Sequence, residues 1–105
     1  MSFKGNIFFA VKTPLDINVR TTGDYWQYLS TIKHPIMKGK EDIVKATLQS
    51  PDEIRQSSTD KDVFLYYKQS DKLYCVVVRH NGLEGYLITA YPTDKVKEGV
   101  IVWTR

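Results

Sequence analysis

The sequence contains very little cysteine and histidine, and it has no long apolar run. Its one cysteine, Cys75, excludes an intramolecular disulfide and any zinc site built from several cysteines. Cys75 lies in the apolar stretch LYCVVV, so we expect it to be a small core residue. The apolar stretch at residues 7–11 is shorter than a signal peptide or a membrane span of about 18 residues requires. We therefore expect a cytoplasmic protein without a membrane partner, a metal or a cofactor.

Several catalytic patterns are also missing. The chain has no glycine-rich phosphate loop and no nucleophile elbow, which argues against a nucleotide-hydrolysing enzyme or an α/β-hydrolase. Two carboxylate pairs, at Asp52-Glu53 and at Asp60 and Asp62, have the positions of turn and cap residues. Paired-carboxylate catalysis is therefore not expected.

The bulk composition is that of an ordinary folded domain. The 105 residues are 42% hydrophobic and 26% charged, which suits a single domain over residues 1–105 with its own core. The net charge of +3 permits a polyanionic partner such as RNA but does not require one.

The hydrophobic pattern predicts strands, then two helices, then more strands. Residues 1–23 are typical of two short strands or a hairpin. Residues 24–50 fit two helices, the first capped by Asp24 and ended by Pro35. Its expected apolar face, by spacing, is made of Tyr25, Tyr28, Leu29 and Ile32.

Residues 53–105 alternate with a period of two, as in a sheet. The longest β-branched run, at residues 72–80, is the expected central strand, and residues 84–93 pair back on it. Residues 93–99 are expected to form a single helical turn before the last strand. The predicted fold class is α+β: two helices packed on an antiparallel β-meander of four to five strands, with an N-terminal β-hairpin.

Turn residues suggest a register for the predicted sheet. Asn81-Gly82 is the strongest hairpin signal, and as a two-residue turn it places Tyr74 opposite Thr89. A two-residue turn at residues 70–71 aligns Tyr67 with Tyr74. Because a slip of one residue moves every side chain to the other face, only the alternation within one strand is independent of these turns.

Hydroxyls and cations gather at the end of one predicted strand. Thr89 and Tyr91 share a side of the strand, and Lys95 follows directly. Tyr and Thr are common on half-exposed sheet faces, and lysines are common in solvated turns. The same groups also suit phosphate binding, and Arg79 and His80 on the neighbouring strand add to them.

Four stretches resemble the small metal-independent ribonucleases of the barnase–EndoU–colicin–RelE superfamily, most closely its phage and bacterial branch. They span about two thirds of the chain and read HP (34–35), TLQSPDEIRQS (47–57), VVVRH (76–80) and YLITAYPTDKVKEG (86–99). The resemblance implies that the ribose 2′-oxygen attacks the adjacent phosphate, which gives a 2′,3′-cyclic phosphate and a free 5′-hydroxyl. This chemistry needs a base, an acid and cations near the phosphate.

The resemblance also implies roles for individual residues. It makes His34 the acid or base, Arg79 the phosphate clamp, and Thr89 and Tyr91 hydrogen-bonding groups for the phosphate or the attacking hydroxyl. Residues implied to contact the flanking RNA are Lys38, Arg55, Lys68, His80 and Lys95. His80 is also a candidate second acid or base. Because relatives of this kind act as toxins, an antitoxin-like protein partner is a further expectation.

Each of these residues also has an ordinary structural interpretation. His34 suits the C-terminal end of a helix dipole, Arg79 suits an ion pair, and the lysines suit solvated surfaces. The alternative to an enzyme is a non-catalytic module that binds RNA or protein and keeps the same fold.

Overall fold

The computed structural model describes residues 6–96 and 99–105, in which the chain forms seven strands and two α-helices. The strands are β1 (Ile7–Lys12), β2 (Asn18–Thr22), β3 (Glu53–Gln56), β4 (Val63–Gln69), β5 (Leu73–Asn81), β6 (Glu84–Thr93) and β7 (Val100–Thr104). The helices are α1 (Gly23–Tyr28), which continues as a π-helical turn (Leu29–Lys33) and a 3₁₀ turn (Pro35–Met37), and α2 (Glu41–Gln49). The α+β class is confirmed. Within the described residues, no helix is long and apolar enough to cross a membrane.

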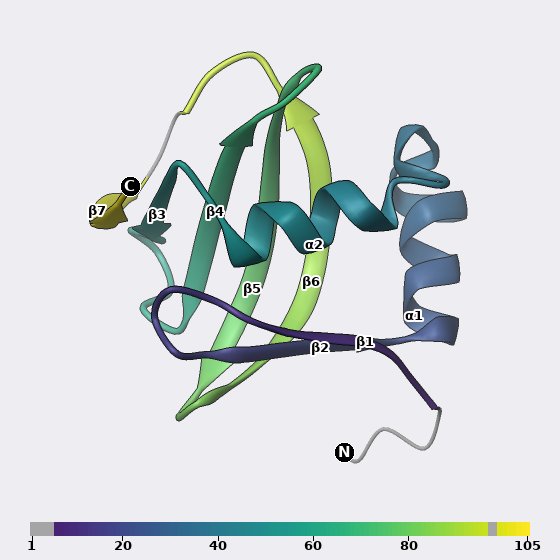
Figure 1. The fold of residues 1–105 in the computed structure, drawn as a ribbon, viewed down its shortest axis with the longest axis horizontal. Helices are drawn as coiled ribbons and strands as arrows, with labels where there is room; N and C mark the ends of the chain where they lie inside the picture. The colour runs from purple at the N-terminus through teal and green to yellow at the C-terminus, as the bar shows by residue number, and fades with distance from the viewer. Residues whose placement is uncertain (1–5, 97–98) are drawn as a thin grey trace.

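The seven strands form one sheet in the order β1-β2-β6-β5-β4-β3-β7 (Figure 1). Strands β3 to β6 pair as an antiparallel meander, and β7 extends it by pairing with β3. The expectation of four to five strands was wrong, because the N-terminal hairpin belongs to the same sheet. Asn18–Arg20 pairs in parallel with Glu84–Tyr86, which covers backbone groups that β6 would otherwise expose at an edge.

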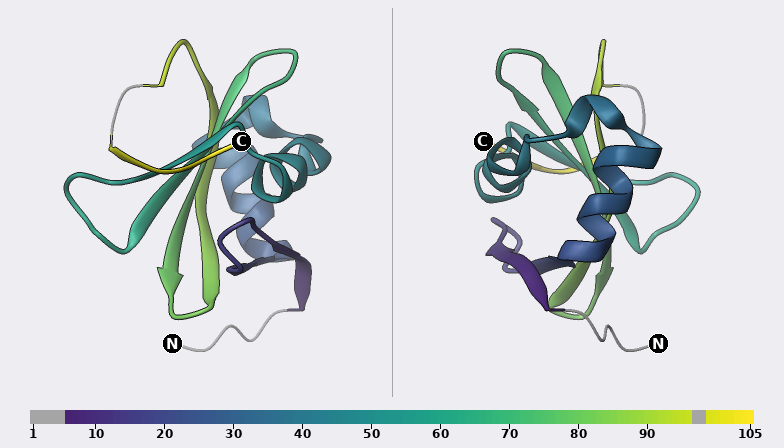
Figure 2. Two further views of the ribbon diagram at one scale, coloured as in Figure 1. Left: turned by 60° about the vertical axis from the view of Figure 1, so that its left-hand side comes forward. Right: turned by 90° about the vertical axis from the view of Figure 1, so that its right-hand side faces the viewer.

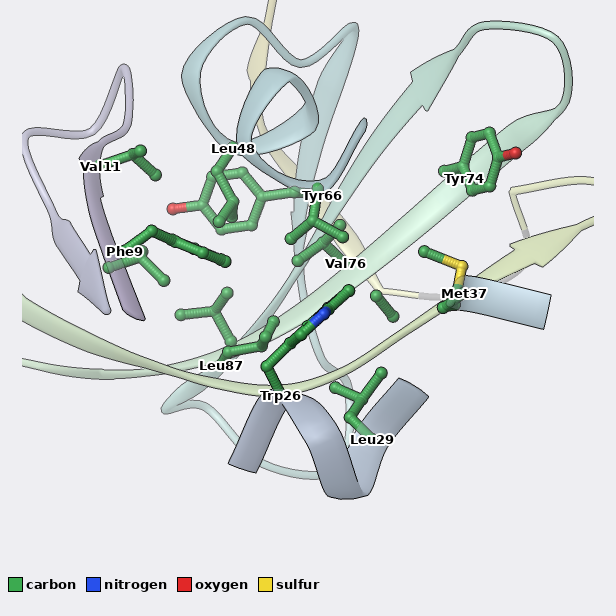
Figure 3. Packing of buried hydrophobic residues seen from close by; sticks show 14 of the residues in the cluster. Phe9, Val11, Trp26, Leu29, Met37, Leu48, Tyr66, Tyr74, Val76 and Leu87 are labelled. Atoms are coloured by element: carbon green, nitrogen blue, oxygen red, sulfur yellow. The ribbon is translucent and has the colours of Figure 1, made fainter. Parts of the chain in front are cut away.

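Both helices lie against the same face of the sheet, as Figure 2 shows from two sides. We call this surface the helix face and the opposite surface the back face. The main core fills the space between the helices and the helix face, where Trp26, Leu29 and Met37 approach the strands (Figure 3). Fully buried strand side chains in this core include Ile54, Tyr66, Tyr74, Val76, Val78 and Ala90.

Only half of the apolar face expected for the first helix packs into the core: Leu29 and Tyr25 do, but Tyr28 and Ile32 do not. Trp26 and Leu29 are buried, whereas Tyr28 and Ile32 are 48% and 68% exposed. The indole of Trp26 offers the largest apolar area in this segment, and burying it sets the rotation of the helix. The π-helical turn then widens the helix, which shifts the positions that follow relative to a regular period of 3.6.

The turn between β4 and β5 is longer than expected. Residues 70–72 form the loop, and the pairing begins with Gln69 opposite Leu73. Tyr67 therefore lies opposite Cys75 on the back face, and the expected alignment of Tyr67 with Tyr74 was wrong.

The hairpin between β5 and β6 turns at Gly82-Leu83 rather than at Asn81-Gly82. Gly82 has a φ of 64°, a conformation that favours glycine at the first central position of a tight hairpin turn. This shift of one residue, together with a bulge further along, places Tyr74 opposite Pro92 instead of Thr89.

A β-bulge at Ile88 determines where the hydroxyls of β6 point. Ile88 has no partner on β5, because Val77 pairs with Thr89 and the next residue of β5 pairs with Leu87. Leu87 is buried in the main core, and the extra residue turns Thr89 to the back face instead of the same side as Leu87. The hydroxyl of Tyr25 in α1 donates a hydrogen bond to the carbonyl of Ile88, which satisfies the bulged backbone.

The back face has a smaller apolar cluster of its own. Its buried members are Leu65, Tyr67 and Cys75, with Leu73, Val77, Tyr91 and Val96 packed around them. The helical turn expected at residues 93–99 includes residues 97–98, which lie outside the described residues. The back face therefore has a small apolar core of its own.

Candidate functional site

The end of the first helical segment brings His34 to the back-face end of β6. The π-helical turn closes with a hydrogen bond of 2.8 Å from the His34 N–H to the carbonyl of Leu29, five residues earlier. The segment from Leu29 to Met37 contacts β6 along the edge that β2 leaves uncovered. As a result, the imidazole of His34 lies beside the ring of Tyr91, with 5.4 Å between ring centroids. The structure therefore brings together two of the predicted catalytic residues.

Thr89 lies on the same strand, two residues before Tyr91. Both side chains belong to the back face, where Thr89 faces Val77 and Tyr91 faces Cys75. The Oγ1 atom of Thr89 is shielded from solvent and has no hydrogen-bond partner among the described residues. A buried hydroxyl without a partner costs free energy, so this atom is suited to accept or donate a hydrogen bond when a polar group arrives.

Arg79 lies apart from His34 and Tyr91. It is four residues along β5 from Cys75, the partner of Tyr91, which corresponds to about 13 Å along the strand. Its guanidinium forms an ion pair of 3.0 Å with Asp60, and its side chain is 48% exposed. The backbone N–H of Asp62, and then Arg79, lower the pKa of the Asp60 carboxyl. The structure does not bring the predicted phosphate clamp to the predicted acid or base.

His80 is half-buried on the helix face of the sheet. Its ring stacks on Phe64 with 3.9 Å between centroids, and its Nε2 lies 3.0 Å from the hydroxyl of Tyr66. That hydroxyl also donates to Oγ1 of Thr13, so His80, Tyr66 and Thr13 form one continuous chain of hydrogen bonds. Burial lowers the pKa of His80 from 6.5 to about 4 and raises the pKa of Tyr66 to about 12. His80 therefore lies on the opposite face of the sheet from Thr89 and Tyr91.

Two of the predicted RNA-binding cations have structural contacts. Arg55 forms an ion pair with Glu53 on its own strand and donates to the carbonyl of Gly99 at 3.3 Å. Lys68 donates to the carbonyl of Ser50 at 2.8 Å, which satisfies the C-terminal end of α2. These contacts account for both side chains without a ligand.

The remaining predicted cations are exposed. Lys38 follows the 3₁₀ turn after His34, and Lys95 follows β6. The hydroxyl of Thr93 donates to the carbonyl of Lys95 at 3.3 Å, which ties this turn to the end of the strand. Lys38 therefore follows His34 by four residues, and Lys95 follows Tyr91 by four residues.

Sequence reasoning missed a depression beside the end of β6. It has a volume of about 490 Å³ and is lined by Gln69, Lys72, Leu73, Pro92, Thr93 and Asp94. Its residues come from the β4–β5 hairpin and from the end of β6, so they are far apart in the sequence. Only the correct register of the sheet, which the longer loop at residues 70–72 sets, brings them together.

The geometry gives one half-buried imidazole, one phenol and one unsatisfied hydroxyl on the same edge of the back face. Such a set suits proton transfer and hydrogen bonding to an anion. Among residues 6–96 and 99–105, no group of three or more His, Cys, Asp or Glu side chains is placed to hold a metal ion. No family model, curated protein or solved structure matches this chain.

Proposed function

We propose that this chain is a metal-independent endoribonuclease, with its site at His34, Tyr91 and Thr89. The observation that carries the proposal is the contact between the His34 and Tyr91 rings on the strand that presents Thr89. His34 lies 55 residues before Thr89 and 57 before Tyr91 in the sequence, so only the fold brings it to them. The ribonuclease resemblance assigns chemical roles to the same three residues.

The reaction breaks one phosphodiester bond within the RNA. A base removes the proton of the ribose 2′-hydroxyl, and the 2′-oxygen forms a bond to phosphorus while the bond from phosphorus to the 5′-oxygen breaks. An acid gives a proton to that 5′-oxygen, so the products are a 2′,3′-cyclic phosphate and a 5′-hydroxyl. His34 and Tyr91 are the two proton-transfer groups in the proposal, because they are adjacent and both can hold or release a proton.

Thr89 is proposed to hydrogen-bond a non-bridging phosphate oxygen. Its hydroxyl has no partner among the described residues, and it is shielded from solvent, so the proposal requires the side chains around it to shift when a phosphate oxygen binds. Hydrogen bonds to charged oxygens are stronger than neutral ones, and they stabilise charge that builds up in the transition state. Lys38 and Lys95 add positive charge nearby, whereas Arg79 is not assigned to the reacting phosphate.

The test is cleavage of mixed RNA by the purified protein in EDTA, followed by analysis of the new ends. The proposal predicts 2′,3′-cyclic phosphate and 5′-hydroxyl ends, and their loss in a His34→Ala protein that unfolds at the wild-type temperature. A Lys33→Ala protein is the matched control, since it alters the neighbouring side chain and leaves the imidazole in place. Intact RNA over a range of pH and substrates contradicts the proposal.

A second candidate function is a non-catalytic module that binds a protein partner, such as an antitoxin-like protein. The observation that favours it is the exposure of three apolar side chains between α1 and the 3₁₀ turn: Tyr28 is 48% exposed, Ile32 68% and Ile36 47%. Contiguous exposed apolar groups are typical of contact surfaces. An Ile32→Glu variant separates the two functions: it leaves RNA cleavage unchanged if the site is at His34 alone, and it abolishes partner binding if these side chains are the contact.

A further inference from the structure

Strand β7 forms one open edge of the sheet (Figure 1). It pairs with β3 on one side, and on its other side no strand lies beside it among the described residues. An edge strand presents backbone N–H and C=O groups to which a further strand can bond. Proteins commonly protect such edges with charged side chains or proline, and residues 100–104 (VIVWT) contain neither. The composition of β7 therefore suits a strand that accepts a partner.

The exposed apolar side chains of β7 project to both faces of the sheet. Val100 is 65% exposed and Ile101 is 50% exposed. They pair with the consecutive residues Gln56 and Arg55 of β3, and neighbouring residues of a strand project to opposite faces. A partner that packs on one face therefore covers only one of the two apolar side chains. A strand added alongside β7 shields both and also bonds to the open backbone groups.

Both ends of β7 are held against β3, so the edge is preorganised. At Gly99, a Cβ atom would collide with the carbonyl oxygen of Gln56, and the Gly99 carbonyl accepts a hydrogen bond from Arg55. At the other end, the N–H of Arg105 donates to the carbonyl of Asp52 at 3.0 Å, and its guanidinium forms an ion pair with the Asp52 carboxylate. A strand fixed in this way loses little conformational freedom when a partner binds.

We propose that β7 pairs antiparallel with β7 of a second copy of this chain, which joins the two sheets across a two-fold axis. Most soluble oligomers are symmetric, and in a two-fold dimer the same surface of both copies forms the contact. The charges favour the antiparallel direction. It places the two Arg105 side chains at opposite ends of the contact, about 20 Å apart along the strands, whereas a parallel pairing places them side by side. An uncharged strand is then covered by another uncharged strand.

The size of this contact limits its strength. β7 has five residues, and Val102 has no partner on β3, which makes it a β-bulge. Short length and bulges both weaken edge pairing, so we expect a reversible dimer with a dissociation constant of about 10–300 μM. Strands β3, β4 and β5 lie between β7 and β6, so the dimer contact does not include the proposed reaction site. The inference is therefore independent of the ribonuclease proposal.

The experiment is sedimentation equilibrium of the purified protein at concentrations from about 10 μM to about 1 mM. We expect a monomer–dimer equilibrium without larger species. Val102 is the middle residue of β7, so Val102→Lys and Val102→Glu each place two like charges near the two-fold axis. Each variant alone should dimerise at least about tenfold more weakly than wild type. An equal mixture of the two should regain the dimer, because the charges across the axis are then opposite.

Ile7→Lys is the matched control, because Ile7 is an exposed apolar residue on β1 at the other edge of the sheet. We expect this variant to dimerise like wild type, and thermal unfolding checks that all variants are folded. A wild-type protein that stays monomeric at about 1 mM overturns the proposal. A dimer that survives both changes at Val102, a mixture that stays monomeric, or loss of the dimer in Ile7→Lys also overturns it. Species larger than a dimer indicate head-to-tail pairing of β7 with β1 and contradict the two-fold contact.

Discussion

Two histidine–tyrosine pairs lie on opposite faces of the same sheet, and the two imidazoles differ in the contacts that they make with the rest of the protein. His80 stacks on Phe64, bonds to Tyr66 and belongs to a buried chain that ends at Thr13. His34, which is half-buried as His80 is, lies beside Tyr91 on the strand that also carries the unsatisfied hydroxyl of Thr89. The contrast shows that the presence of a histidine says little about function until its partners are known.

The surroundings of His80 also change its pKa. Burial lowers the pKa of His80 to about 4, so this imidazole is neutral near pH 7 and acts as a packing and hydrogen-bonding group. A histidine used for proton transfer has to exchange protons with a substrate, which requires an open approach. Both imidazoles are half-buried, but the ring of His80 is held between Phe64 and the Tyr66 hydroxyl, whereas His34 lies at the end of a helical segment beside Tyr91.

The largest expected effect is on RNA cleavage, from the change His34→Ala. We expect the rate to fall by about 100-fold to 10,000-fold, which is the usual contribution of a positioned acid or base. The free energy of unfolding should change by less than about 0.5 kcal/mol, because the ring lies at the edge of the fold. Rates on a defined RNA, combined with denaturant unfolding, measure both quantities, and a rate within threefold of wild type contradicts this assignment.

The reverse result is expected for His80→Ala. The change removes the stack on Phe64 and leaves the Tyr66 hydroxyl with Thr13 alone, so the free energy of unfolding should fall by about 2 kcal/mol. Cleavage per folded molecule should stay near the wild-type value. Urea unfolding read by far-UV circular dichroism measures the first quantity, and an unchanged midpoint argues against a structural role for His80.

The pH dependence of stability sharpens the same contrast. The pKa of His80 is lower in the folded protein than the ordinary value of 6.5, so the unfolded chain binds more protons between pH 6.5 and about 4. The contribution of His80 to stability is therefore present above pH 6.5 and is lost as the pH falls through this window. The loss should be about 1–2 kcal/mol, after allowance for the partial exposure of the ring.

Unfolding curves at a series of pH values measure this loss. A His80→Phe protein is the control, because it keeps an aromatic ring against Phe64 and has no group that titrates there. We expect its stability to depend less on pH between 6.5 and 4 than that of the wild type. Parallel curves for the two proteins contradict the assigned cause.

A smaller effect is expected from Thr89→Val, which keeps the shape of the side chain and removes its hydroxyl. Because that hydroxyl is shielded and unpartnered among the described residues, the change should leave the unfolding free energy equal or slightly higher. Cleavage should fall by about tenfold if the hydroxyl binds a phosphate oxygen. Thr21→Val is the matched control, because its hydroxyl is also shielded and unpartnered among the described residues but lies on β2. Equal rates for Thr89→Val and wild type remove Thr89 from the site.

The smallest effect is expected from Arg79→Ala. Its guanidinium is exposed, paired with Asp60 and about 13 Å along the strand from the level of Tyr91. We expect cleavage to change by less than about threefold and stability by less than about 1 kcal/mol. A loss of 100-fold or more in cleavage restores Arg79 as the phosphate clamp, as the sequence resemblance first implied.

Sequence patterns located most of the secondary structure, because strong local signals mark those elements. The strand Glu84–Thr93 coincides with the predicted one, since alternation and a preceding Asn-Gly signal define it. Its register was not predictable, because the bulge at Ile88 depends on the packing of Leu87 and on a hydrogen bond from Tyr25. Local sequence carries no record of such distant contacts.

The candidate site was predictable only in part for the same reason. His34, Thr89 and Tyr91 were identified as residue types with suitable chemistry, but their proximity depends on the π-helical turn and on the edge of β6. His80 had the same residue type, and only its burial against Phe64 separates it from the site. The face of the first helix was predicted only in part: Leu29 and Tyr25 pack into the core as expected, but Trp26 is buried where Tyr28 and Ile32 were expected to be.

The most direct test of a site at His34 is to compare how the NMR signals of the two imidazoles change when a nucleic acid that cannot be cleaved is added. The chain has two histidines, so their NMR ring signals can be assigned with a His80→Gln protein and followed during titration with a mixed-sequence 2′-deoxy oligonucleotide. We predict that the His34 signals shift in a saturable way and that the His80 signals stay within experimental error. Shifts confined to His80, or no shift of His34 at saturation, would contradict a site at the edge of β6.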